Sequence, residues 1–78
     1  MRSEPKLRRS KLAAELRAEL ARQKMTVTSL SLSTHITVPT LRNRLAGTRP
    51  FFIEELDTIC AVLGVGLTEL IDRTEADS

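Results

Sequence analysis

Leucines repeated at helical spacing are the feature that most constrains how this chain can fold. Leu12, Leu16 and Leu20 recur every four residues, which predicts a helix over residues 11–24 with one apolar face. The only aromatic residues are Phe51 and Phe52, and a β-sandwich or barrel normally needs more aromatic and turn-forming residues than this chain has. We therefore expect an all-α domain. Further apolar residues follow the helical pattern: Ala13, Ala21, Ile53, Leu56, Ile59, Cys60 and Leu63.

Capping residues and glycines divide the chain into five short helices. Ser10, Thr26 and Thr37 are of types that favour helix N-caps, and Pro39 is tolerated in a first turn. Gly47 and Gly64 are natural helix ends, and Gly66 can cap a last helix. The helices are expected at residues 11–24, 27–34, from Thr37 to Gly47 with Leu41 and Leu45 inward, 53–63, and from 67 to about 72.

The segment from Val27 to Thr34 is ambiguous, because polar and apolar residues alternate there as in a strand. A lone strand in a helical domain would lack a pairing partner. Val27, Leu30 and Thr34 also share one helical face, so we predict a short helix. That choice leaves Leu32 largely exposed.

The length of 78 residues suits one small domain. We expect a basic arm over residues 1–9, a folded domain over 10–72 and a flexible acidic tail over 73–78. The one cysteine, Cys60, is expected in the core, and with the one histidine, His35, it leaves no set of ligands for a metal. No cofactor is expected.

Charge is distributed very unevenly. Residues 1–50 hold eleven basic and three acidic side chains, a formal charge of +8, whereas residues 51–78 hold one basic and seven acidic, a formal charge of −6. A basic two-thirds suits a module that places one face on a polyanion. Two ordinary solvated surfaces are the alternative. The longest uncharged run, 25–41, has eight Ser or Thr among its seventeen residues, and no apolar leader follows the basic N-terminus, so we expect a cytoplasmic protein that spans no membrane.

Only His35 and Ile36 join the second and third expected helices, and so short a link makes two helices cross steeply, as in a helix-turn-helix. A series of residues at matching spacing runs through the chain: Leu30-Ser31, His35-Ile36-Thr37, Leu41, Leu45, Gly47, Arg49-Pro50, Leu56, Ile59, Leu63-Gly64-Val65, Leu67 and Leu70. In this series the chain resembles the lambda-repressor-like (Cro/CI or XRE) DNA-binding domains over residues 10–72.

Three positions depart from the family pattern. Its usual turn glycine is His35 here, a residue type enriched among non-glycine residues with positive φ. Its frequent glutamine at the start of the second helix is Val27, so Thr26 or Thr28 would have to supply that phosphate contact. Its buried Arg–Glu pair between the first and third helices matches Leu20 and Leu45, and an apolar pair can replace such an ion pair without loss of stability.

The resemblance implies that the third helix reads DNA and that flanking residues hold phosphates. The base-reading candidates are Val38, Pro39, Thr40, Arg42 and Asn43. The phosphate-binding candidates are Thr26, Thr28, Arg44, Thr48 and Arg49. The candidate N-terminal arm comprises Arg2, Lys6, Arg8, Arg9 and Lys11, with no DNA contact by residues 1–5 as an equal alternative.

The expected function is a sequence-specific transcriptional regulator that binds a roughly palindromic operator as a homodimer, since one reading helix covers too few bases. Candidate dimer residues are Phe51, Phe52, Val65, Leu67, Leu70 and Ile71, with core closure as their alternative role. The length resembles a compact phage Cro-type protein more than a full CI repressor. An antitoxin with an acidic toxin-blocking surface and a protein-interaction module without DNA binding are alternatives. No catalytic constellation appears, so an enzyme is not expected, nor is a small-molecule substrate.

Overall fold

The computed structural model describes residues 9–76 and contains five helices in that part of the chain. The helices are α1 (Arg9–Gln23), α2 (Val27–Thr34), α3 (Val38–Leu45), α4 (Ile53–Leu63) and α5 (Leu67–Ala76). The predicted all-α architecture is confirmed. Within residues 9–76, none of the helices combines the length and the apolar character needed to cross a membrane.

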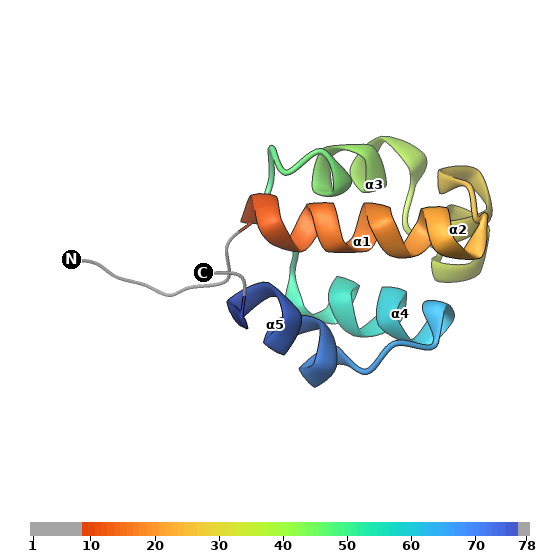
Figure 1. The fold of residues 1–78 in the computed structure, drawn as a ribbon. Coiled ribbons are helices and arrows are strands. Elements are labelled where there is room, and N and C mark those ends of the chain that lie inside the picture. The colour runs from red at the N-terminus through yellow and green to blue at the C-terminus, as the bar shows by residue number, and fades with distance from the viewer. Residues whose placement is uncertain (1–8, 77–78) are drawn as a thin grey trace.

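The long helix α1 lies at the centre of the fold and packs against α3, α4 and α5, while α2 packs against α3 and α4 (Figure 1). The first turn of α1 and the last turn of α5 lie at the same end of the molecule, and α2 lies at the opposite end (Figure 1). The leucine stripes of α1, α3 and α4 meet between the helices. The buried cluster contains Leu12, Leu16, Leu20, Leu30, Leu41, Leu45, Leu56, Ile59, Cys60, Leu63 and Leu70.

The ambiguous segment is helical, as predicted. The Thr26 hydroxyl accepts a hydrogen bond from the Ser29 N–H at 3.0 Å, so Thr26 is the N-cap of α2. Leu30 and Thr34 are buried, whereas the Leu32 side chain is 75% exposed. The pattern of burial in this segment therefore follows helical spacing and not strand-like alternation. The reason is that α2 buries its apolar face against neighbouring helices.

Three helix ends and the burial of one residue differ from the sequence prediction. α1 already includes Arg9 and Ser10, so Ser10 is not its N-cap. Thr37 occupies the N-cap position of α3 but makes no capping bond, because its hydroxyl donates to the Thr40 hydroxyl instead. The C-cap of α3 is Ala46, and Gly47 with φ of 81° comes one residue later. Ile53, expected in the core, is 58% exposed, because it is the first residue of α4 and lies beyond the helices that cover the rest of its stripe.

The end of α5 corrects the expected tail. Residues 73–76 continue the helix rather than starting a flexible segment. The Thr74 side chain is only 1% exposed and its hydroxyl donates to the Leu70 carbonyl at 3.0 Å. The acidic composition of this segment predicted a flexible tail, but Thr74 within it is buried and hydrogen-bonded in the last turn of α5.

Lys24 is a feature that the sequence analysis missed. It has a φ of 54°, a left-handed conformation that costs energy for a residue with a Cβ. The turn it forms lets the Met25 N–H bond the Leu20 carbonyl at 2.9 Å, which ends α1 and starts the approach to α2.

Candidate nucleic-acid interface

The turn between α2 and α3 is held by side chains as well as by backbone. His35 has a φ of 64° and its N–H bonds the Ser31 carbonyl, which confirms the predicted turn role. The Ser31 hydroxyl donates to the Ile36 carbonyl at 2.6 Å, and the Thr34 hydroxyl accepts from the Ile36 N–H at 3.2 Å. These bonds fix the angle between the two helices and so the direction in which α3 presents its outer face.

The face of α3 opposite the core carries the candidate base-reading residues. Leu41 is fully buried and Leu45 is 5% exposed, which anchors one side of the helix in the core. On the other side Pro39, Arg42 and Asn43 are exposed, while Val38 and Thr40 are half-buried. All five candidates therefore reach solvent to some degree, and three of them are open to a ligand.

Four of the five phosphate-binding candidates are exposed: Thr26, Thr28, Thr48 and Arg49. Thr26 lies at the N-terminus of α2, where its hydroxyl already caps the helix. The Thr48 hydroxyl donates to the Asn43 carbonyl at 3.0 Å, so Thr48 closes the end of α3. Both threonines remain exposed, Thr26 at the start of α2 and Thr48 after the end of α3.

Arg44 has a different surrounding from the one expected. Its Nε and Nη2 donate to the two carboxylate oxygens of Glu55 at 2.8 and 3.2 Å, and its side chain is only 14% exposed. The Phe52 ring lies 5.4 Å from the guanidinium carbon. Because its charge is neutralised and covered, Arg44 joins α3 to α4 and is no longer our candidate for phosphate binding.

Glu55 is the centre of this contact. Burial acts to raise the pKa of its carboxyl, but hydrogen bonds from Arg44 and from the Phe52 N–H outweigh burial and hold the pKa below its ordinary value. The Phe52 N–H bond, at 3.0 Å, also caps the start of α4. One carboxylate thus contacts both the end of α3 and the loop that follows it.

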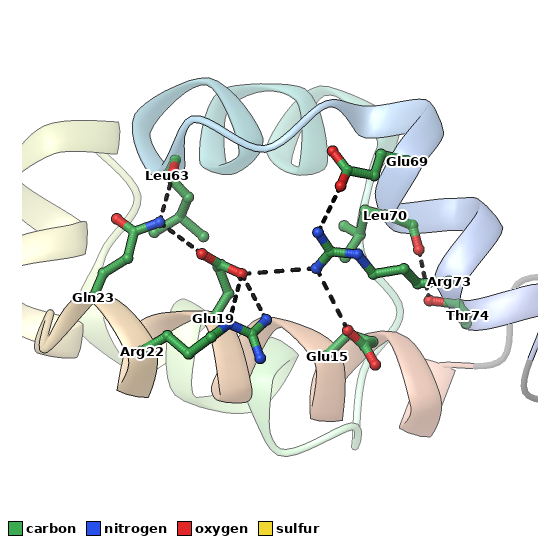
Figure 2. Close-up of polar contacts among 9 residues, drawn as sticks. All are labelled: Glu15, Glu19, Arg22, Gln23, Leu63, Glu69, Leu70, Arg73 and Thr74. Carbon is green, nitrogen blue, oxygen red and sulfur yellow. Dashed lines mark hydrogen bonds and ion pairs between the residues drawn. The ribbon is translucent and has the colours of Figure 1, made fainter.

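A second acidic cluster neutralises arginines on the α1–α5 side of the molecule (Figure 2). Arg73 donates to Glu69 at 2.7 Å and lies within 4 Å of Glu15 and Glu19. Glu19 also accepts from Arg22 at 2.6 Å and from Gln23 at 2.8 Å. These hydrogen bonds from Arg22 and Gln23 lower the pKa of Glu19. Gln23 reaches further to the Leu63 carbonyl, so the cluster links α1 to α4 as well as to α5.

The described arginines differ in whether a glutamate compensates their charge. Among the described side chains, Arg22, Arg44 and Arg73 are ion-paired with glutamates. Arg17, Arg42 and Arg49 have no carboxylate partner within that part of the chain. These three come from α1, α3 and the loop after α3. Two of them, Arg17 and Arg42, lie together where α1 packs against α3.

Arg17 was missed by the sequence analysis. Its Nη1 donates to the Leu45 carbonyl at the end of α3, across the contact between α1 and α3. Nothing in the sequence distinguishes Arg17, because it is one of several polar residues of α1 that lie outside the leucine stripe. Only the packing of α1 on α3 brings Arg17 beside the end of α3.

The candidate arm is only partly described. Arg2, Lys6 and Arg8 lie outside the described residues. Arg9 and Lys11 belong to α1, so they are not part of an arm that precedes the first helix. Lys11 is half-buried.

The dimer candidates separate into core and surface residues. Leu70 is 1% exposed and belongs to the core, so it is not available to a partner. Phe51, Val65 and Leu67 are partly buried and pack against the core. Phe52 is 63% exposed, next to the exposed Ile53, and Ile71 is half-buried. Cys60 is buried as predicted, and burial, with the charge of Asp57, raises the pKa of its thiol.

The hydrogen-bonded turn between α2 and α3, and the packing of α3 on the core through Leu41 and Leu45, are the features of a helix-turn-helix domain. The model of the Cro/C1-type HTH DNA-binding domain matches residues 15–76. The chain therefore belongs to the Cro/C1-type helix-turn-helix family, which confirms the resemblance seen in the sequence.

Two solved structures share the fold. Both are crystal structures of the clp gene regulator ClgR from Corynebacterium glutamicum, and each is 24% identical to this chain. One aligns over 95% of both chains with a TM-score of 0.81, and the other over 96% of this chain and 79% of its own with a TM-score of 0.83. A comparison with curated proteins gave no match.

Proposed function

We propose that this protein is a transcription regulator that inserts α3 into the major groove and binds an approximately palindromic operator as a homodimer. The observation that carries the proposal is that three arginines have no carboxylate partner among the described residues: Arg17, Arg42 and Arg49. Phosphates would supply the missing negative charge. Structural likeness to a gene regulator is in line with this role.

Arg42 and Asn43 are the proposed base readers. An arginine can pair with a guanine edge and an asparagine with an adenine edge, each through two hydrogen bonds. Both side chains are exposed on α3 beyond its anchored face. Val38, Pro39 and Thr40 would supply apolar contact with thymine methyl groups. Thr26, Thr28, Thr48 and Arg49 would hold the backbone and set the register of the helix.

The homodimer is proposed on the exposed apolar residues Phe52 and Ile53, which lie together where α4 begins. Two copies would present two reading helices, and half-sites about one helical turn of DNA apart would follow. Phe52→Ser should lower the fraction of dimer in sedimentation while the protein stays folded.

The function is tested by selecting duplexes from a random pool with the purified protein and sequencing them. A symmetric enriched motif is the expected result. Arg42→Ala and Asn43→Ala should each weaken binding to that motif by about 1–3 kcal/mol, while Arg22→Ala, which removes an arginine from the α1–α5 side, should leave it unchanged. Absence of any enriched motif with a folded protein would refute sequence-specific binding and favour a protein partner.

A further inference from the structure

An open apolar groove lies between the end of α1, the start of α2 and the end of α3. It has a volume of about 520 Å³. Most of its lining is apolar: Leu20, Ala21, Met25, Val27, Leu45 and Ala46. Its size lies within the range of sites that bind small molecules.

Two of these residues explain why the groove is apolar. Leu20 and Leu45 occupy the positions where the resemblance places a buried Arg–Glu pair, and both are nearly fully buried here. Beside them, Ala21 and Ala46 are exposed and carry only a methyl group. The apolar pair and the small neighbours leave a hydrocarbon-lined space that a longer or charged side chain would fill.

Two arginines give the groove a charge. Arg17 and Arg42 belong to its lining, and no acidic residue does. Arg17 uses one N–H on the Leu45 carbonyl, and a guanidinium has five N–H donors in all. The Arg42 side chain makes no hydrogen bond or ion pair with any described residue. The groove is thus apolar along its walls and complementary to an anion beside them.

We propose that this groove binds an amphipathic carboxylate, a medium-chain acyl acid whose tail lies along Ala21, Val27 and Ala46 and whose carboxylate pairs with Arg17 and Arg42. The tail is favoured by burial of apolar surface and the head by charge-assisted hydrogen bonds. Neither feature alone selects this class, because an apolar molecule gains nothing from the arginines and a simple anion gains nothing from the walls.

Occupancy of the groove should weaken operator binding, a consequence that rests on the proposed function. Thr26 and Arg42 line the groove and are also candidate DNA contacts. A carboxylate on Arg42 would neutralise a charge needed for DNA, so ligand and operator would compete. The regulator would then release its operator when such acids accumulate.

Binding is tested first without DNA, by titrating the protein with sodium octanoate and following backbone amide shifts by NMR. Saturable shifts at Ala21, Val27 and Ala46 are expected. Butyrate, four methylenes shorter, should bind at least about tenfold more weakly because less apolar surface is buried. Octanol should also bind more weakly, because it lacks the charge. Equal binding of butyrate and octanoate, or shifts spread over the whole surface, would overturn the proposal.

Variants separate the site from the rest of the molecule. Ala21→Phe should fill the groove and abolish octanoate binding, and the exposed position of Ala21 keeps the core intact. Arg17→Gln with Arg42→Gln should weaken binding about tenfold. The matched control is Arg22→Gln, which removes a charge from the same helix outside the groove. Retained octanoate binding in Ala21→Phe would refute the assignment, and thermal melting checks that each variant is folded.

The selected operator then distinguishes two failures. Octanoate binding without operator binding would uphold the site and refute the proposed function. Operator binding without octanoate binding would refute the inference alone. If, in addition, Ala21→Phe weakens operator binding, the groove is a contact for the DNA backbone.

Discussion

The guanidinium of Arg44 in α3 and the carboxylate of Glu55 in α4 form a two-pronged ion pair, with Nε to Oε1 at 2.8 Å and Nη2 to Oε2 at 3.2 Å. The same carboxylate accepts a hydrogen bond from the Phe52 N–H, so one residue of α4 holds both the end of α3 and the loop between the two helices. Such a geometry is stronger than an ordinary surface pair because it is bidentate and partly covered.

This pair predicts a loss of stability in acid. The pKa of Glu55 is lower in the folded chain than in the unfolded chain, so the unfolded chain binds the proton more readily. The stabilisation is complete above the unfolded pKa of about 4.5 and is lost as pH falls through the folded pKa. Urea unfolding at pH 6 and pH 3 should show a smaller acid-induced loss in Glu55→Gln than in the parent. Glu54→Gln is the control, and equal losses in all three proteins would contradict the prediction.

A buried charge should not be tolerated at Leu45. Leu45→Glu would replace a leucine that is 5% exposed and packed near Leu20 by a carboxylate that has to leave water, and we expect a loss of at least about 1 kcal/mol in the free energy of unfolding, because a pair with the neighbouring Arg17 or Arg42 would offset only part of that cost. Adding Leu20→Arg should recover part of this loss by restoring a pair. The conservative Leu45→Met should cost less than about 1.5 kcal/mol. An unchanged melting temperature in Leu45→Glu would refute the match of these positions.

The left-handed turn at Lys24 predicts a stabilising change. Lys24 is exposed, so its side chain has little packing to lose. Lys24→Gly should raise the free energy of unfolding by about 0.5–1 kcal/mol, because glycine adopts positive φ without a steric penalty. Lys24→Ala keeps the strained backbone and should show no such gain. Chemical denaturation of both variants gives the comparison.

The last turn of α5 predicts where the chain can be shortened. Ending the chain after Asp72 removes the buried Thr74 and the Arg73 contacts with α1, and should cost about 1–2 kcal/mol. Ending it after Ala76 should cost nothing measurable. A truncation at Asp72 that melts like the parent would restore the flexible tail expected from composition.

Arg49 predicts a change in the salt dependence of DNA binding. Arg49 is exposed and has no ion pair among the described residues. If it holds one phosphate, Arg49→Ala should weaken binding to all sequences alike and reduce the slope of log affinity against log salt by about 0.9. Fluorescence anisotropy at several salt concentrations measures the slope. An unchanged slope would remove Arg49 from the phosphate set.

The leucine periodicity predicted the fold well, because apolar spacing and turn chemistry are local properties. Helix α4 and the Thr26 cap follow from residue types alone, whereas the left-handed His35 follows from the resemblance, because His35 stands where the family usually has a glycine. Leu70 could not be separated from Ile71 by pattern, because both lie on the apolar side of α5 and only packing against α1 decides which is buried.

The charged residues were harder to place. Arg44 and Glu55 are eleven positions apart on different helices, and nothing in their spacing shows that they pair. Arg17 looked like a solvated residue until α1 was packed on α3. Long-range ion pairs depend on how helices cross, so the sequence identifies the basic two-thirds of the chain but not which of its arginines are neutralised.

The shared end of α1 and α5 has a practical consequence (Figure 1). Helix α1 begins at that end and α5 finishes there, whereas α2 lies at the other end (Figure 1). A polypeptide fused before Arg9 or after Ala76 would therefore begin on the side opposite the α2–α3 turn. A fluorophore, affinity tag or second binding module could be attached at either point without covering the α2–α3 turn. The same proximity would let a short engineered linker join the two helices into a circularly permuted chain with new ends in an exposed loop.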